Sequence, residues 1–135
     1  MDDEKRRILI IEDDEEMRSL LRDFFEEEGF ETDSVSNGSE AFRVLVREVF
    51  DIVITDIRMP GLTGLDIIPG VRKLQPETTI IVITAFGSGE VHRKAMERGA
   101  NSYLEKPLRF DELKKMVHEL LSSKAKRRDG QWSAS

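Results

Sequence analysis

An α/β fold around a parallel sheet is what this chain of 135 residues predicts. Three unbroken apolar runs, rich in β-branched residues, are typical of strands that are covered on both faces. These runs are Ile8–Ile11, Ile52–Ile54 and Ile80–Ile83. Apolar residues recur at helical spacing between and after the runs, and strands that alternate with helices indicate a parallel α/β sheet.

The first helix has the clearest periodicity. Its apolar stripe begins at Met17 and recurs at i+3, i+4, i+7 and i+8. We expect this helix to start near Asp14, which can accept hydrogen bonds from its free N–H groups, and to stop at Gly29. Similar stripes over residues 41–45 and 113–121 predict two further helices.

The helix expected between the runs Ile52–Ile54 and Ile80–Ile83, the third in chain order, carries Pro69-Gly70 in its interior. Proline removes a helical hydrogen bond and glycine adds backbone freedom, so we expect this helix to be kinked or broken there.

Two weaker segments complete the set of strands. Residues 31–35 are mostly polar and residues 101–104 form a short segment, and such strands belong at the edges of a sheet. With the three apolar strands inside, a flavodoxin-like, doubly wound, five-stranded sheet with five helices and the order 2-1-3-4-5 satisfies this arrangement. Ligands of such sheets bind beyond the carboxyl ends of the strands where the winding reverses, here between strands one and three.

Composition excludes several classes of protein. The 27 Asp and Glu exceed the 21 Lys and Arg, and a net charge of −6 argues against direct nucleic-acid binding. Without cysteines, the chain has no disulfide, thiolate zinc site or cysteine nucleophile. The charged N-terminus is followed by only four apolar residues, too few for a signal peptide or a membrane span, so we expect a cytoplasmic protein without membrane contact.

One domain accounts for most of the chain. A hydrophobic fraction of 39% is sufficient for one core, which we place in residues 1–122. Residues 123–135 lose the apolar periodicity, and we interpret them as a C-terminal tail or linker, with a frayed helix end followed by disordered residues.

Carboxylates gather where the predicted winding reverses. Glu12, Asp13 and Asp14 follow strand one, and strand three ends at Asp56. Crowded carboxylates raise one another's pKa unless a cation compensates, and a hard, oxygen-seeking ion such as Mg²⁺ or Mn²⁺ suits them.

Two further polar residues point to the same corner. Strand four ends at Thr84, whose hydroxyl can donate to an oxyanion, and Lys106 lies in the loop after strand five. An acidic acceptor, a divalent ion, a hydroxyl and a lysine are what phosphoryl transfer to a carboxylate requires, because positioning and charge neutralisation supply the catalysis.

Over residues 6 to 122 the chain resembles the receiver domains of response regulators in the two-component signalling family. Five separated motifs match in the same order, and together they are highly specific. They are Ile10-Ile11-Glu12-Asp13-Asp14; Asp51-Ile52-Val53-Ile54-Thr55-Asp56; Met59-Pro60-Gly61 with Gly64; Thr84-Ala85; and Gly99-Ala100 with Tyr103 and Lys106-Pro107.

The resemblance implies the roles of the acidic residues. Asp56 would accept the phosphoryl group, and Asp13 would bind Mg²⁺ directly, with Glu12 acting through a water on the ion. The backbone carbonyl of Arg58 would complete the metal site.

The register of the acidic pair rests on Arg18, which the family places five residues after the direct ligand. The alternative register makes Asp13 and Asp14 the pair. Asp14, however, begins the first helix, where capping is the favoured use of an aspartate.

The resemblance also implies a switch. Thr84 and Lys106 would bind the phosphoryl oxygens, and Tyr103 would be the aromatic switch that fills the space left when the dianion draws Thr84 inward. The readout face would then be the fourth helix, the fifth strand and the fifth helix. Packing without any switching is the alternative for Tyr103. We interpret His92 and His118 as surface residues, because they lie on different helices without ligand spacing.

The implied function is that of a regulatory phospho-accepting domain, not an enzyme beyond its own phosphorylation and slow dephosphorylation. Its partners would be a sensor histidine kinase or phosphotransfer protein, an output protein or effector domain, and a second copy in a phosphorylation-dependent homodimer. The stretch Thr55–Gly61, with Thr84–Gly87, is similar to receivers attached to ATP-dependent transcription activators, which points to a transcriptional output.

Two other functions remain open at this point. A metal-dependent phosphatase also uses an Asp nucleophile, but it usually carries a second acid/base Asp close by, where this chain has Ile57-Arg58. A docking module of the same fold would bind partners without taking a phosphoryl group.

Overall fold

The computed structural model describes residues 5–58, 64–85 and 89–134, with side chains described up to residue 123. Of the motifs identified in the sequence, Met59-Pro60-Gly61 and Phe86-Gly87 lie outside the described residues.

In the described part of the chain, five parallel strands form one sheet in the order β2-β1-β3-β4-β5, with five helices, as the sequence predicted. The polar β2 and the short β5 lie at its edges. The strands are β1 (Arg7–Ile11), β2 (Glu31–Val35), β3 (Ile52–Asp56), β4 (Thr79–Thr84) and β5 (Ser102–Glu105). The helices are α1 (Glu15–Glu27), α2 (Gly38–Leu45), α3 (Gly64–Leu74), α4 (Gly89–Arg98) and α5 (Phe110–Ala134).

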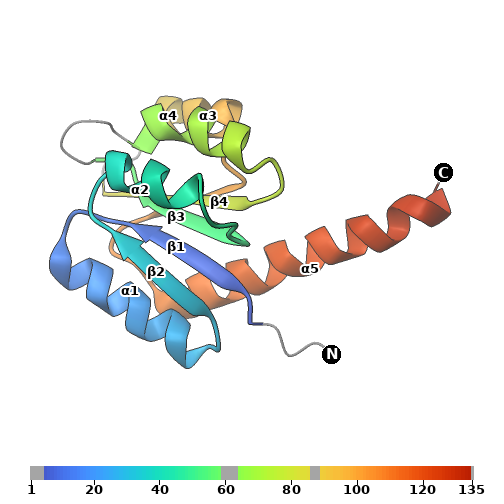
Figure 1. The fold of residues 1–135 in the computed structure, drawn as a ribbon, viewed down its shortest axis with the longest axis horizontal. Helices are drawn as coiled ribbons and strands as arrows, with labels where there is room; N and C mark the ends of the chain where they lie inside the picture. Colours follow the sequence, from blue (N-terminus) through green and yellow to red (C-terminus); the bar gives the residue numbers. More distant parts are fainter. Residues whose placement is uncertain (1–4, 59–63, 86–88, 135) are drawn as a thin grey trace.

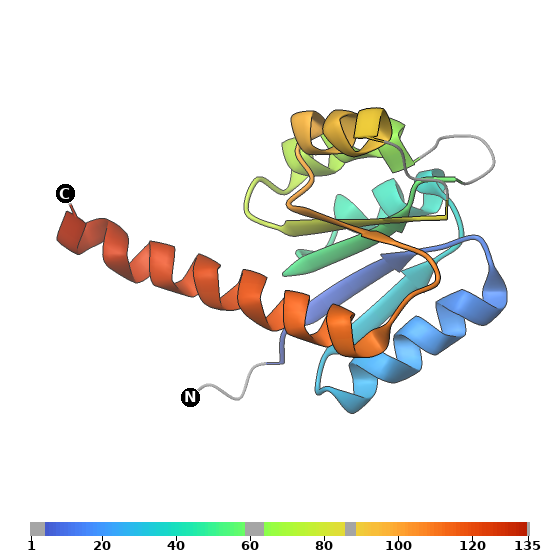
Figure 2. The same cartoon turned by 180° about the vertical axis from the view of Figure 1, so that it is seen from behind.

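Helices cover both faces of the sheet. Helices α1 and α5 lie on one face and α2, α3 and α4 on the other (Figures 1 and 2). Alternate residues of β1 divide between the two cores, since Ile8 and Ile10 pack toward α1 and α5 while Leu9 and Ile11 pack toward the opposite layer. Each such side chain is fully buried, which stabilises the fold by about 1.5–3 kcal/mol per residue. Two-sided burial explains the unbroken apolar runs.

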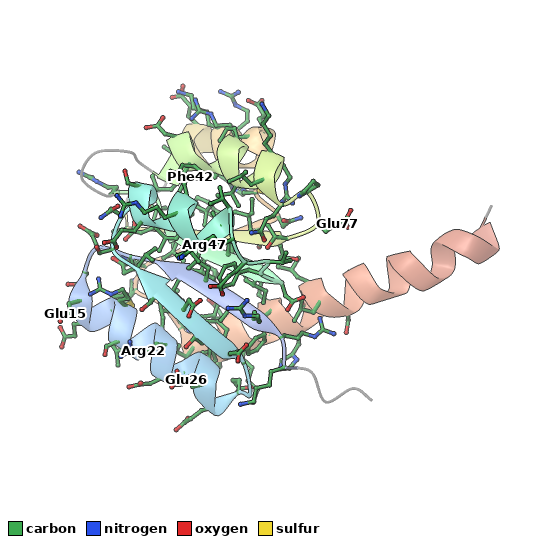
Figure 3. All side chains as sticks on the ribbon, in the orientation of Figure 1. Glu15, Arg22, Glu26, Phe42, Arg47 and Glu77 are labelled. Atoms are coloured by element: carbon green, nitrogen blue, oxygen red, sulfur yellow. The ribbon has the colours of Figure 1, made fainter. Side chains whose placement is uncertain are left out.

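Helix α1 begins and ends as expected. The Oδ2 of Asp14 accepts a 2.9 Å hydrogen bond from the Met17 N–H, and Gly29 adopts the left-handed φ of 95° just after the helix. The charged side chains of Glu15, Arg22 and Glu26 are exposed on the outer side of this helix (Figure 3).

Of the two outcomes expected for the third helix, kinked or broken, the break was wrong. Helix α3 runs without a break from Gly64 to Leu74, with Pro69 inside it. Gly70 has a packing role here, because a Cβ at this position would lie 2.8 Å from the ring of Phe42 on α2. The Phe42 ring therefore packs directly on the backbone of Gly70, and a larger residue there would displace the ring.

Disorder after Ser122 was a wrong expectation, because α5 continues as a helix to Ala134. The assignment of residues 123–135 as a tail or linker stays a prediction. Its last turns extend beyond the sheet and away from the other helices (Figures 1 and 2). The sequence after Ser123 is rich in Lys, Arg and Ala, which have high helix propensity, so loss of an apolar stripe does not end the helix. No helix among the described residues combines the length and apolar character needed to cross a bilayer.

Candidate functional site

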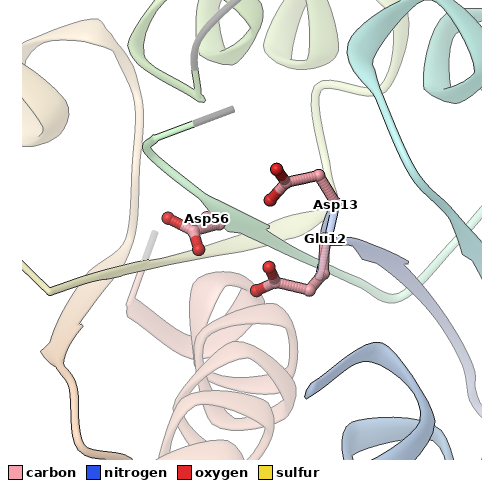
Figure 4. A group of neighbouring side chains, drawn as sticks. All are labelled: Glu12, Asp13 and Asp56. Atoms are coloured by element: carbon pink, nitrogen blue, oxygen red, sulfur yellow. The ribbon is translucent and has the colours of Figure 1, made fainter. Parts of the chain in front are cut away.

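The carboxyl ends of β1 and β3 place three carboxylates together. The two strands are parallel neighbours, with Ile11 opposite Thr55, so Glu12 and Asp13 emerge beside Asp56. One oxygen from each of the three side chains lies within 4.8 Å of the others (Figure 4). Glu12 and Asp56 are 2% and 5% exposed, whereas Asp13 is open to solvent.

Glu12 is held in place by two backbone contacts. Its Oε2 accepts a 3.0 Å hydrogen bond from the Asp14 N–H, and its carbonyl oxygen accepts one of 2.8 Å from Nη1 of Arg18 on α1. Burial raises the pKa of Glu12 to about 7, and the charge of Asp56 adds to this effect, against the opposing hydrogen bond from Asp14. The site therefore favours either a proton or a cation near Glu12.

Both oxygens of Asp56 have a donor. The Arg58 N–H donates to Oδ1 at 2.9 Å, and the Lys106 ammonium donates to Oδ2 at 2.6 Å. The same ammonium lies 3.5 Å from Oε1 of Glu12. Burial works against the charge of Lys106, but the hydrogen bond and charge of Asp56, together with Glu12, raise the pKa of Lys106 overall. Lys106 therefore remains a cation beside the carboxylates.

The ends of β4 and β5 support Lys106. Its backbone N–H donates to the Thr84 carbonyl at 2.8 Å, and the Lys106–Pro107 peptide is cis. Thr84 is fully buried at the end of β4, directly after Ile83, which pairs with Asp56. Four strand ends thus converge on one corner of the molecule.

The chemistry of this corner suits a hard divalent cation. Its donors are carboxylate oxygens on Glu12, Asp13 and Asp56, the ligand type that Mg²⁺ prefers. The negative charge of three carboxylates exceeds what one lysine can neutralise. The carbonyl of Arg58 as a further ligand stays a prediction.

Gly64 supports the site in a way that sequence reasoning missed, since it was noted there only as part of a motif. A Cβ at Gly64 would lie 2.4 Å from the carbonyl oxygen of Asp56 and 2.7 Å from Cα of Ile57. The Gly64 N–H also donates to the Ile57 carbonyl at 2.9 Å. The start of α3 therefore packs directly on the backbone of Asp56, and only glycine permits this approach.

Tyr103 lies half-buried on β5, and His92 of α4 stacks on it. The ring centroids are 4.4 Å apart and the planes differ by 8°. The Tyr103 hydroxyl is buried and has no hydrogen-bond partner among the described residues. Burial raises the pKa of Tyr103, and the charge of Glu105 adds to this. His92 is exposed, as expected, but the stacking was missed, because no sequence pattern relates a residue on a helix to one on an edge strand.

The remaining histidine, His118, is exposed on α5. Its Nε2 lies 3.9 Å from Oε1 of Glu28, which also faces Lys114 at 3.5 Å. Neither histidine contributes to the acidic corner.

The chain as a whole is similar to known proteins. A family model of the response regulator receiver domain matches residues 8–118. Sporulation initiation phosphotransferase F of Bacillus subtilis is 30% identical over 119 residues, which cover 88% of this chain and 96% of that protein. The DNA-binding transcriptional regulator NtrC of Azospirillum brasilense is 37% identical over 116 residues, 86% of this chain and 24% of that protein. This chain thus spans about a quarter of the length of that regulator.

A solved structure shows the same fold. The crystal structure of a CheY-like response regulator receiver domain protein from Methanospirillum hungatei has a TM-score of 0.88 and 27% identity, and the match covers 92% of this chain and 99% of that one.

Proposed function

The chain belongs to the response regulator receiver family, and from this premise we propose that Asp56 accepts a phosphoryl group from a phosphohistidine, in the presence of Mg²⁺. Phosphorylation of Asp56 would then change the conformation of the face formed by α4, β5 and α5. The donor is a sensor histidine kinase or a phosphotransfer protein.

One observation carries the proposal, namely the convergence of Asp56, two further carboxylates and Lys106 at the ends of neighbouring strands. A carboxylate is already ionised at neutral pH and needs no base to become a nucleophile. An oxygen of Asp56 attacks phosphorus, the P–N bond to the donor imidazole breaks, and its electron pair leaves with that nitrogen. The product is an aspartyl phosphate.

The chain's own residues supply positioning and charge. Hydrogen bonds from Arg58 and Lys106 fix the Asp56 carboxylate. The Lys106 ammonium would form an ion pair with a phosphoryl oxygen. The buried Thr84 hydroxyl, at the adjacent strand end, is the second donor we assign to the phosphoryl oxygens. A Mg²⁺ ion held by Asp13, Asp56 and the Arg58 carbonyl, with Glu12 in its outer sphere, would neutralise the incoming charge.

The output is a surface change. Thr84 and Tyr103 lie on the adjacent strands β4 and β5, so a movement of Thr84 toward the phosphoryl group reaches the Tyr103 ring and the stacked His92. We propose that this face binds an output protein, an effector domain or a second copy of the chain. The similarity to NtrC supports a transcriptional output.

The test is the intact mass of the protein after incubation with acetyl phosphate, with and without Mg²⁺. Wild type should gain one phosphoryl group only with the metal, and Asp56→Asn should gain none. Asp14→Asn is the matched control, since asparagine also caps a helix, and it should be phosphorylated like wild type. Equal phosphorylation of Asp56→Asn would overturn the assignment.

Two further measurements, turnover of a phosphate ester and incubation with a phosphorylated histidine kinase, separate the rival functions. Sustained turnover of a phosphate ester, without an accumulating phosphoprotein, would indicate a phosphatase. No mass gain with acetyl phosphate or with a phosphorylated histidine kinase would indicate a docking module.

A further inference from the structure

Pro69 leaves a backbone acceptor open in the interior of α3. The carbonyl of Leu65 would normally accept a hydrogen bond from the N–H four residues later, but residue 69 is proline and has no N–H. Because α3 continues without a break, this carbonyl stays in the helix and needs another donor.

Arg98 of α4 supplies that donor. Its Nη1 lies 2.9 Å from the Leu65 carbonyl oxygen and 3.8 Å from Oδ1 of Asp66. The contact joins two helices that are 33 residues apart in sequence at this point. It is a charge-assisted hydrogen bond, and its acceptor exists because of the proline.

A second arginine, Arg72, lies on α3 and donates to the chain that follows α4. Nη2 of Arg72, near the end of α3, donates to the Gly99 carbonyl just beyond α4 at 2.7 Å and to Oδ1 of Asn101 at 2.8 Å. Arg72 binds the chain just after α4, whereas Arg98 is the last residue of α4 and binds α3 directly. Guanidinium groups from both helices therefore join α3 and α4 at the C-terminal end of α4, in addition to the apolar packing of Ala95 in the shared core.

Helix α4 also carries His92, whose ring stacks on Tyr103. Arg98 and His92 lie on the same ten-residue helix, so a contact that fixes one end of α4 also limits where the His92 ring can rest. We propose that Arg98 and the carbonyl left open by Pro69 form a brace that holds α4 on α3 and thereby positions His92 on Tyr103. The importance of this position for signalling rests on the proposed function, whereas the brace itself does not.

The first test is a double-mutant cycle measured by urea unfolding, with Arg98→Met, Pro69→Ala and the double variant. In the Pro69 background, Arg98→Met should lower the folding equilibrium constant roughly threefold to tenfold, the usual range for one hydrogen bond. In the Pro69→Ala background, Arg98→Met should lower the folding equilibrium constant by a smaller factor, because the N–H of the introduced alanine can donate to the Leu65 carbonyl.

Asp66→Asn is the control for the ion pair. Arg98→Met should still show most of its effect when combined with Asp66→Asn. Two results would overturn the brace. One is an effect of Arg98→Met on the folding equilibrium constant that is the same with and without Pro69→Ala. The other is the loss of that effect in the Asp66→Asn background.

The second test measures position by proton NMR. The chain has two histidines and one tyrosine, so the ring protons of His92 can be assigned against those of His118. Arg98→Met should shift the His92 resonances, which lie over the Tyr103 ring, and leave those of His118 unchanged. Unchanged His92 resonances would overturn the positioning role. Neither test involves phosphorylation, so failure here is distinct from failure of the proposed function.

Discussion

The ammonium of Lys106 lies 2.6 Å from Oδ2 of Asp56 and 3.5 Å from Oε1 of Glu12, so one cation pairs with carboxylates at the ends of two strands. Its charge would repel a metal ion bound by these carboxylates and would attract an incoming phosphoryl group. The charge of Lys106 should therefore affect metal binding and phosphorylation in opposite directions.

Replacement of Lys106 by methionine should tighten Mg²⁺ binding about tenfold and slow phosphorylation. The ammonium repels a divalent cation at close range, so its removal favours the ion, while the phosphoryl oxygens lose their partner. Calorimetric titration with Mg²⁺ and the rate of mass gain with acetyl phosphate measure the two effects.

Lys114→Met is the matched control for this prediction. Lys114 lies on α5 and faces Glu28, away from the acidic corner, so its removal should change neither quantity. Weaker Mg²⁺ binding by Lys106→Met would show that Lys106 organises the carboxylates and does not compete with the metal.

The metal-free protein should lose stability as the pH rises toward neutrality, because of Glu12. Burial raises the pKa of Glu12 from 4.5 to about 7, so the folded state binds its proton more tightly than the unfolded state does. The stabilisation is complete below pH 4.5 and is lost as the pH rises through 7. Urea unfolding in EDTA between these limits should show a loss of about 1–3 kcal/mol.

Two comparisons test the role of Glu12 in this pH dependence. Glu12→Gln cannot ionise and should flatten the slope, giving a protein that is more stable than wild type at pH 7 without metal. In the wild-type protein, saturating Mg²⁺ should restore the free energy of unfolding that is lost as the pH rises to 7, since the cation replaces the proton. An unchanged slope in Glu12→Gln would assign the pH dependence to other groups.

Gly64→Ala should reduce both stability and phosphorylation. A Cβ at Gly64 would lie 2.4 Å from the Asp56 carbonyl oxygen, a backbone atom that cannot rotate away, so the start of α3 must shift. We expect a loss of about 1–3 kcal/mol in the free energy of unfolding, the usual cost of such overpacking.

Gly89→Ala is a matched control, because Gly89 also begins a helix but a Cβ there meets no atom of the described residues within 4 Å. It should keep or increase stability, since alanine favours a helix. Equal losses in the two variants would show that helix starts, and not the contact with Asp56, govern the effect.

The fold and the acidic corner could be predicted because their signals are local. Residues 52–56 form a buried strand whose apolar run leads to an aspartate, and the topology of parallel strands puts Asp56 beside Glu12. The order of the strands followed from which of them were apolar. These inferences need only periodicity and the rule that strand ends share one edge.

Contacts between distant elements could not be predicted. Pro69 and Gly70 indicate a kinked or broken helix in isolation, yet Phe42 packs on Gly70 and Arg98 donates to the carbonyl that Pro69 leaves open. Both compensations come from other helices. The role of Gly64 depends likewise on a backbone approach that no spacing in the sequence encodes.

His92→Ala should lower the pKa of the Tyr103 phenol toward its ordinary value. Burial raises this pKa, with the charge of Glu105 adding to the shift. Removal of the ring that stacks on Tyr103 should expose the phenol to more water. Since Tyr103 is the one tyrosine in the chain, ultraviolet absorbance of phenolate during an alkaline titration reports on it alone.

His118→Ala is the control for this titration, because His118 lies on α5 and pairs with Glu28. Glu105→Gln should also lower the Tyr103 pKa, by removing a nearby negative charge. If His92→Ala titrates like wild type while Glu105→Gln is shifted, the phenol is buried by β5 and its other neighbours, and the stacked histidine contributes no shielding. A downward shift in both variants would show that α4 covers Tyr103 in solution, so that any displacement of α4 changes the environment of this ring.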